Sequence, residues 1–423
     1  MTPDAQAQAG PPATDPADHQ MLMDIFGGTW DPSPAFAKLR ESRPVAHIPE
    51  LEIWLVSRYE DCVTVIRDVK NFGHMPTDMM SEVPDELKDV LPHGYQVWYP
   101  TLINTDPPVH TRIRKLAQKP ITPRAVARKE DDIRAAAHAI VDEFVDDGQA
   151  DILQAFALPL PIKVLQLILG IPPEDLKKFE RWIINTTELF NPAISPEQRL
   201  ELARDQVDFG AYVANAIQRR RDEPADDLIS ELIAVEEEGE KRLTDMEVQG
   251  VVAQLILAGF DTTAGALCFA LMHLCRNPEI LERVRNDSSL LPVVVEETVR
   301  RSTPVRGVVR QTKNDVVLNG QTIPAGSRVM AMASSANQDP EQFSCPHQFD
   351  IDRDPSELRR HIGFGQGVHK CIGQPIAQTD IRVGLEVLLE RLPNLRLASE
   401  DMPMSPGMIF LRPSKLELAW DKP

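Results

Sequence analysis

The sequence of 423 residues predicts a mainly α-helical fold with small β-sheets. Apolar residues recur with helical spacing along most of the chain. The longest such run extends to about Arg276 and begins with the capping box Thr244-Asp245-Met246-Glu247. Short β-rich segments are separated by turn signals such as Asn319-Gly320. Hydrophobic residues make up 42% of the chain and aromatic residues only 5%, so we expect a large core that is packed mainly by aliphatic side chains.

The elements are taken in chain order. Residues 1–18, rich in Ala, Pro, Gln and Asp, are expected to form a disordered tail, and residues 19–423 a single domain, because no linker or repeat divides them. Helices are expected at residues 35–42, 59–69, 125–145, 152–169, 173–189, 197–220, 226–236, 244–276, 292–302 and 372–391, with another starting at Asp106-Pro107-Pro108. Strands are expected at residues 45–47, 52–56, 307–311, 316–318, 328–332 and 415–420. Prolines interrupt residues 72–105, which we expect to form one wall of an apolar pocket.

Composition narrows the class of protein. The formal charge of −19 argues against general nucleic-acid binding. The five cysteines are scattered without a CxxC pair, which fits neither a disulfide framework nor a zinc site and favours the cytoplasm. The N-terminus lacks the basic and apolar regions of a signal peptide. The apolar run Val251–Leu274 contains Asp261 and other polar groups, so a buried helix is expected rather than membrane insertion.

The first chemical motif is the loop from Phe364 to Gly373, which places three glycines around one cysteine, Cys371. A lone cysteine is most often buried and inert. Here the glycines would let backbone N–H groups and the start of the following helix point at the sulfur, which suits a thiolate metal ligand.

The second motif is Ala258-Gly259-Phe260-Asp261-Thr262-Thr263 in the middle of the long helix. Polar groups in a core helix are costly unless they are paired or solvated. One interpretation is structural, with a threonine bonded to the carbonyl one turn back and the aspartate in a salt bridge. The other is functional, with a helix widened at Gly259 and with Asp261 and Thr262 relaying protons to bound oxygen.

The third motif is Glu297-x-x-Arg300, followed by Arg353. A Glu-x-x-Arg pair on a helix is usually a solvent-exposed ion pair and is weak evidence alone. It gains weight from its position between the other two motifs.

The three motifs in this order resemble the cytochrome P-450 family of haem-thiolate monooxygenases, and in particular its soluble bacterial members. The segment Asp106–Arg114 extends the resemblance, which covers the chain from about residue 30 to the C-terminus. Ile372, Ile376 and Gln378 depart from the residues commonest in the family, where Gln378 often corresponds to Arg. The resemblance implies a triangular helical prism, with haem b between a long central helix and the cysteine loop.

The resemblance also implies residue roles. Cys371 would ligate the iron, and Asp261 and Thr262 would form the catalytic acid–alcohol pair. Glu297, Arg300 and Arg353 would form a buried ion-pair network. The cofactor-binding residues would be His110, Arg114, Arg310 and His369 at the propionates, together with Phe364, Gly365, Cys371 and Gly373 in the loop.

The implied reaction is insertion of one oxygen atom from O2 into a C–H bond of a small to medium hydrophobic substrate. Electrons would come from NAD(P)H through a ferredoxin and its reductase, because the chain carries no flavin or iron–sulfur signature. We hypothesise that a basic patch of Arg112, Lys115, Arg359, Arg360 and Lys370 docks an acidic ferredoxin; the alternative is ordinary solvated surface charge. A monomer is expected. The alternatives are a peroxide-driven peroxygenase, whose relatives usually lack the acid–alcohol pair, and a non-catalytic haem sensor, which would not need it.

The substrate itself cannot be read from the sequence. The expected pocket is apolar, and Arg306 is the one cation near it that could hold a carboxylate. The pocket residues expected are Trp98, Leu102, Phe190, Leu255, Ala258, Val305, Val308 and Ile409.

Overall fold

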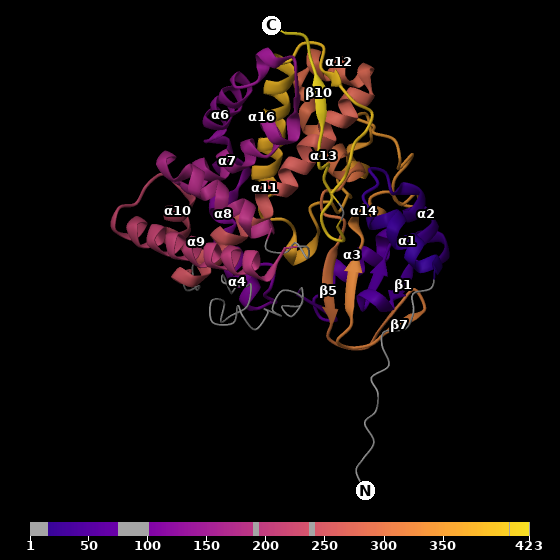
Figure 1. Cartoon of the computed structure of the whole chain (residues 1–423). Coiled ribbons are helices and arrows are strands. Elements are labelled where there is room, and N and C mark those ends of the chain that lie inside the picture. Colours follow the sequence, from indigo (N-terminus) through magenta and orange to yellow (C-terminus); the bar gives the residue numbers. More distant parts are fainter. Residues whose placement is uncertain (1–15, 75–100, 189–193, 237–241, 406, 423) are drawn as a thin grey trace.

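The computed structural model describes residues 16–74, 101–188, 194–236, 242–405 and 407–422. The chain is mainly helical with small sheets, as predicted, and the helices form most of one side of the molecule in Figure 1. The largest sheet lies with the N-terminal helices on the other side. Trp98 and Phe190, two of the expected pocket residues, lie outside the described residues.

The N-terminal part contains the predicted hairpin and helices. Its elements are α1 (Pro16–Phe26), α2 (Ser33–Ser42), β1 (Val45–Ile48), β2 (Ile53–Val56), α3 (Tyr59–Arg67) and β3 (Phe72–Gly73). Strands β1 and β2 pair antiparallel, with Val45 opposite Val56. Helix α1 begins at Pro16, whereas the tail was expected to reach residue 18.

The helical side is built from α4 (Val109–Ala117), α5 (Pro123–Ala127), α6 (Glu130–Asp142), α7 (Pro159–Leu169), α8 (Leu176–Glu188), α9 (Pro196–Asp222) and α10 (Leu228–Ala234). A single helix over residues 125–145 was wrong, because the chain breaks between α5 and α6 at Arg128–Lys129. Thr122 caps α5, and three acidic residues in the first turn of α6 favour a new helix N-terminus there.

The long helix α11 (Asp245–Arg276) starts at the predicted cap. The Thr244 hydroxyl accepts a hydrogen bond from the Glu247 N–H at 3.2 Å, and the Glu247 carboxylate accepts one from the Thr244 N–H at 2.9 Å. Helices α7, α9, α13 and α16 pack around α11. Among the described helices α11 alone is long and apolar enough to cross a membrane, and 72% of its apolar window is buried inside the protein.

The C-terminal part carries α12 (Pro278–Asn286), α13 (Leu291–Arg301), β5 (Val308–Thr312), β6 (Val316–Leu318), β7 (Gln321–Ile323), β8 (Arg328–Ala331), α14 (Ala333–Ala336), α15 (Pro355–Leu358) and α16 (Gln374–Arg391). Helix α12 was not predicted. Asn277-Pro278 was interpreted only as the end of α11, but Pro278 occupies the first turn of α12, where its missing N–H costs nothing.

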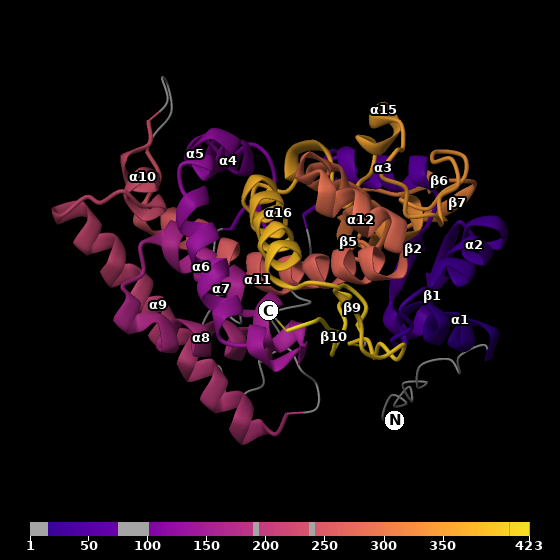
Figure 2. The ribbon, with the colours of Figure 1, turned by 90° about the horizontal axis from the view of Figure 1, so that it is seen from above.

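The described part of the chain forms three sheets, two of which connect segments that are distant in sequence. The largest has the strand order β1-β2-β8-β5-β3, and β2 pairs parallel with β8. A second joins β4 (Gln149–Asp151), β10 (Glu417–Ala419) and β9 (Arg396–Leu397), and the third is the β6–β7 hairpin. Asn319 and Gly320 have positive φ in the turn of this hairpin, as the sequence predicted. Figure 2 shows α16 lying over α11, which brings the start of α16 to the middle of the long helix.

Candidate active site

The loop before α16 presents the Cys371 sulfur to backbone donors. Gly365 and Gly367 have φ of +66° and +67°, in the left-handed region that favours glycine. The Cys371 N–H donates to the Phe364 carbonyl at 2.8 Å, which closes the loop. The sulfur accepts backbone hydrogen bonds from Gly373 and Gln374. Helix α16 starts at Gln374 rather than at residue 372, so its N-terminus lies beside the sulfur.

Two opposing effects act on the Cys371 thiol. Burial raises its pKa, while the two backbone N–H groups and the charge of Arg114 oppose that rise. The side chain nevertheless keeps accessible surface. A thiol that is surrounded by protein and still has accessible surface must face an internal space. A bound metal ion would favour the thiolate form there.

Helix α11 forms the opposite side of this space. Nearly all of its second half is buried, but Ala258 is exposed and Asp261 and Thr262 are half-buried. A Cβ atom placed on Gly373 would lie 3.9 Å from both the Cys371 sulfur and a methyl carbon of Leu255. The cysteine loop and the middle of α11 therefore line the same space, with small side chains on both sides.

Four basic side chains gather at one place although their elements are distant in sequence. The rings of His110, from α4, and His369, from the cysteine loop, lie 4.2 Å apart. Both ring nitrogens of His110 and Nε2 of His369 are buried without a hydrogen-bond partner in the described part of the protein. Arg310, on β5, is buried, and Arg114 contributes a second guanidinium.

The electrostatics of this cluster suit the binding of an anion. Burial lowers the pKa of His110 to about 4 and that of His369 to about 3, with neighbouring arginines adding to both effects. Burial also lowers the pKa of Arg310 to about 10. Among the described residues, Asp106 is the carboxylate that acts on His110, Arg310 and His369, and it is already bonded to Lys313 at 2.8 Å. Buried donors without acceptors are costly, so the cluster fits a group that carries carboxylates, such as the haem propionates.

Thr262 and Asp261 of α11 make the two contacts that a structural role predicts for this motif, a bond to the carbonyl one turn back and a salt bridge. The Thr262 hydroxyl donates to the Ala258 carbonyl at 2.5 Å, and Asp261 Oδ1 accepts from Arg412 Nε at 2.5 Å. The helix is uninterrupted, so the widening expected at Gly259 is not seen. The accessible surface there comes instead from Ala258, whose side chain is small, and from Gly259, which has none. Thr262 lies two turns after Leu255 on the same face of the helix, so it still borders the space that Cys371 faces, and Asp261 lies next to it in the chain.

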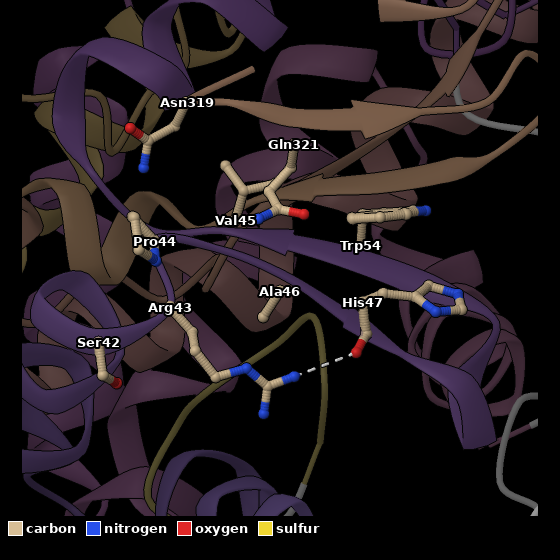
Figure 3. A pocket seen from close by; sticks show the side chains of 9 residues that line it. All are labelled: Ser42, Arg43, Pro44, Val45, Ala46, His47, Trp54, Asn319 and Gln321. Carbon is tan, nitrogen blue, oxygen red and sulfur yellow. Dashed lines mark hydrogen bonds between the residues drawn. The ribbon is translucent and has the colours of Figure 1, made fainter. Parts of the chain in front are cut away.

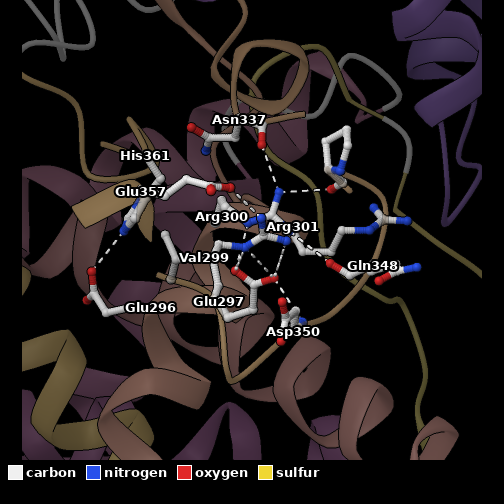
Figure 4. Close-up of polar contacts among 12 residues, drawn as sticks. Glu296, Glu297, Val299, Arg300, Arg301, Asn337, Gln348, Asp350, Glu357 and His361 are labelled. Atoms are coloured by element: carbon white, nitrogen blue, oxygen red, sulfur yellow. Dashed lines mark hydrogen bonds and ion pairs between the residues drawn. The ribbon is translucent and has the colours of Figure 1, made fainter. Parts of the chain in front are cut away.

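The third motif forms a buried ion cluster. Arg300 and Glu297 are fully buried and make two 2.7 Å hydrogen bonds, as Figure 4 shows. Arg353 Nε lies 3.2 Å from Glu297 Oε2. Arg300 also donates to the carbonyls of Asn337, Pro346 and Gln348. A solvent-exposed helical pair is thereby excluded for these residues.

The structure places the described pocket residues in two groups. Leu255 and Ala258 lie on α11, and Leu102 is buried in the core that surrounds this helix. Val305 pairs with Phe410, and the Arg306 N–H donates to the Ile409 carbonyl at 2.7 Å, so these segments lie side by side. Val308 follows on β5.

Arg306, by contrast, is fully buried, and its Nη1 donates to the Ile25 carbonyl of α1. Its guanidinium therefore points away from the internal space, and Arg306 is not in position to hold a substrate carboxylate.

Sequence reasoning missed two residues near this site. Arg412 follows the segment that was interpreted as pocket wall, but a single arginine gives no signal that it pairs with Asp261. Phe410 lies next to the expected residue Ile409 and is 51% exposed. Alternation along an extended chain, which places Phe410 and Arg412 on one side, could have identified both.

A separate cleft of about 310 Å³ lies at the outer edge of the largest sheet (Figure 3). It is lined by Ser42, Arg43, Pro44, Val45, Ala46, His47, Trp54, Asn319 and Gln321. None of these is a predicted site residue, so the cleft is not part of the candidate active site.

Comparison with known proteins decides the family. The family model described as Cytochrome P-450 matches residues 149–420. The chain belongs to the cytochrome P-450 family. It is 34% identical over 396 residues to mycinamicin IV hydroxylase/epoxidase of Micromonospora griseorubida, covering 91% of this chain and 94% of that protein. It is 35% identical to 6-deoxyerythronolide B hydroxylase of Saccharopolyspora erythraea, covering 86% and 89%.

Solved structures agree with this assignment. Cytochrome P-450 CYP109Q5 from Chondromyces apiculatus matches with a TM-score of 0.84 and 34% identity, over 93% of this chain and 96% of that one. CYP109E1 from Bacillus megaterium in complex with corticosterone matches with a TM-score of 0.81 and 28% identity, over 92% and 98%. The predicted fold and family are confirmed, and the protein is a haem-dependent oxidoreductase of the P-450 class.

The buried Arg310 guanidinium of this cluster leads to a prediction in which haem affinity and apoprotein stability change in opposite directions. Arg310→Leu removes a buried charge that lacks a carboxylate, so we expect the haem-free protein to melt at a higher temperature. The same substitution removes an anion donor, so haem should be lost faster to an acceptor such as apomyoglobin.

Arg353→Leu is the matched control, because Arg353 is buried beside Glu297. Breaking that pair should cost about 3–5 kcal/mol with or without haem. Destabilisation of the haem-free protein by Arg310→Leu would contradict the interpretation of the cluster.

Proposed function

We propose that Cys371 is the proximal iron ligand of this monooxygenase and that haem b lies between the cysteine loop and α11. The observation that carries the proposal is the accessible Cys371 sulfur, which faces α11 beside the basic cluster, where three buried histidine ring nitrogens have no hydrogen-bond partner in the described part of the protein. No CxxC pair is present in the sequence for covalent haem attachment, which supports haem b. Among the described residues no cluster of three or more His, Cys, Asp or Glu could hold a metal ion, as expected where a single thiolate is the protein ligand.

In this proposal the bound haem supplies dioxygen activation, and the chain supplies binding, orientation and protons. Gly373 and Gln374 donate hydrogen bonds to the sulfur and so limit its electron donation. His110, Arg114, Arg310 and His369 bind the propionates. Phe364 and Gly365 shape the loop that covers one face of the cofactor.

Asp261 and Thr262 are proposed to move protons on the opposite face. The Asp261 carboxylate would take a proton from solvent, and the Thr262 hydroxyl would pass it on at the position where dioxygen binds. The Ala258 carbonyl, which accepts from Thr262, orients that hydroxyl. Insertion of one atom of O2 into a substrate C–H bond, with the other atom leaving as water, consumes two electrons and two protons, and Asp261 and Thr262 would deliver the protons.

We further propose that the substrate is a small to medium hydrophobic molecule. The side chains that support this are apolar: Leu102, Leu255, Ala258, Val305, Val308 and Ile409. One structural neighbour is named as a complex with corticosterone and another as a complex with testosterone, and both ligands belong to this size class.

Electrons are proposed to arrive from NAD(P)H through a ferredoxin and its reductase, with a monomeric enzyme in the cytoplasm. Arg359, Arg360 and Lys370 are exposed next to the cysteine loop, on a protein whose net charge is −19. Arg112, which was expected in the same patch, instead pairs with Glu247, so its charge is partly neutralised. An acidic ferredoxin would be attracted to the remaining basic residues.

Replacing the sulfur tests the first proposal directly. We expect Cys371→Ser to abolish the red-shifted Soret band of the ferrous carbon monoxide complex, because an alcohol oxygen cannot replace a thiolate donor. Cys345→Ser, at another exposed cysteine, is the control and should keep the band. Retention of the band in Cys371→Ser would reject the iron ligand.

The proton relay is tested by measuring oxygen consumption and hydrogen peroxide release during NAD(P)H oxidation. Asp261→Asn and Thr262→Ala should each raise the fraction of consumed oxygen that is released as hydrogen peroxide. Asp261→Asn should also slow turnover by about 10²-fold, the lower end of the range for a lost general acid. Variants with wild-type peroxide release would refute these roles.

The docking proposal is tested by charge reversal. Arg360→Glu should lower the rate of reduction by a ferredoxin by about tenfold at low salt and weaken its salt dependence, because electrostatic attraction acts mainly on association. Lys422→Glu, an equal charge change at the exposed C-terminal end, should leave both unchanged. Equal effects of the two variants would leave no docking role for Arg360.

A further inference from the structure

Asp261 is held by a residue from the C-terminal segment. Arg412 Nε donates to Asp261 Oδ1 at 2.5 Å, and both side chains are about a quarter exposed, at 26% and 22%. Arg412 Nη1 donates to the carbonyl of Pro413, which fixes the guanidinium at its other end. Within the described part of the chain, no residue hydrogen-bonds to Asp261 Oδ2, so this oxygen can exchange a proton.

A glycine lets the C-terminal segment approach α11 this closely. Gly265 lies one turn after Asp261, on the same face of the helix. A Cβ atom at Gly265 would lie 3.0 Å from Cβ of Arg412 and 3.3 Å from the carbonyl oxygen of Leu411. Such distances are tighter than most contacts that real Cβ atoms make, so a side chain at position 265 would displace the segment from the helix by a few tenths of an ångström.

Backbone hydrogen bonds also hold the segment around Arg412 to two other parts of the chain. The Leu411 N–H donates to the Pro304 carbonyl at 2.8 Å, and the Arg412 carbonyl accepts from the Ser405 N–H at 2.9 Å. Met404 and Pro413 pair as well. Arg412 therefore reaches Asp261 from a fixed backbone, and this distinguishes the pair from an incidental surface contact.

The same segment borders the expected substrate pocket. Ile409 and Phe410 precede Arg412, and Phe410 pairs with Val305. Leu411 is buried, so alternation along the extended chain places Phe410 and Arg412 together on the other side. A substrate that packs against Ile409 or Phe410 would thus contact the segment that holds Asp261.

We propose that Arg412 is a positioning residue for oxygen activation. Its guanidinium fixes Oδ1 of Asp261 and leaves Oδ2 for proton transfer, so proton delivery requires the C-terminal segment to be seated on Gly265. This inference rests on the proposed relay through Asp261. A purely structural role would affect stability and leave the proton-transfer step unchanged.

The test compares Arg412→Gln, Arg412→Lys, Asp261→Asn and the control Arg396→Gln, each purified with haem. Arg396 pairs with Asp421 at 3.2 Å on the surface of the same C-terminal region. The readouts are the rate of NAD(P)H oxidation with a surrogate ferredoxin and reductase, its solvent deuterium isotope effect and the peroxide yield. All three are measured without added substrate, so no ligand has to be known.

We expect Arg412→Gln to slow oxidation by about tenfold, less than loss of the general acid itself, and to raise the isotope effect. Arg412→Lys should restore part of the oxidation rate and bring the isotope effect part of the way back to the wild-type value. Arg396→Gln should match the wild type in both. If Arg412→Gln matches the wild type while Asp261→Asn does not, the positioning role is overturned and the relay stands. If Asp261→Asn also matches the wild type, the relay fails, and the role of Arg412 fails with it.

A second readout does not depend on turnover. The melting temperatures of Arg412→Gln, Asp261→Asn and the double variant form a double-mutant cycle. If the melting temperature of the double variant falls by clearly less than the sum of the decreases in the two single variants, the two side chains interact in solution. Additive effects would mean that the two side chains do not interact, and would overturn the proposal.

Discussion

One fully buried guanidinium holds the irregular chain that leads to the cysteine loop. Residues 337–370 contain only short helical turns, so most of their carbonyl groups cannot be satisfied by regular secondary structure. Arg300 donates to three of these carbonyls, and Glu297 neutralises its charge while accepting the N–H of Asp350. The bonds fix this segment to α13, and Cys371 follows directly from it. The geometry of the sulfur therefore depends on a charge pair to which the sulfur is not bonded.

Local signals predicted most of the elements, because they act over a few residues. The capping box at Thr244, the turn at Asn319-Gly320 and the glycines before Cys371 each specify a conformation by their own chemistry. The errors occurred where two local signals competed, as at Arg128–Lys129, where the helical pattern continues but the chain breaks. Pro278 was misassigned for the same reason, since proline both ends one helix and begins the next.

The candidate site was predictable as a set of residues but not as an arrangement. The motif around Cys371 and the Asp261-Thr262 pair were found from residue type and spacing, supported by the family resemblance. Contacts across hundreds of residues could not be found in this way. Arg412 reaches Asp261 only because Gly265 leaves room for a distant segment. The orientation of Arg306, toward α1 rather than toward the pocket, likewise depends on tertiary packing.

The parallel pairing of β2 with β8 also has a consequence for how the chain folds. Ile53 of β2 lies opposite Arg328 of β8. The β1–β2 hairpin is therefore synthesised long before β8, the strand with which β2 pairs. Contacts so distant in sequence slow folding, because the intervening chain must be ordered before they form. Until β8 arrives, the edge of β2 is unpaired and is open to wrong partners. The order of synthesis thus exposes the N-terminal hairpin to misassembly until β8 has been made.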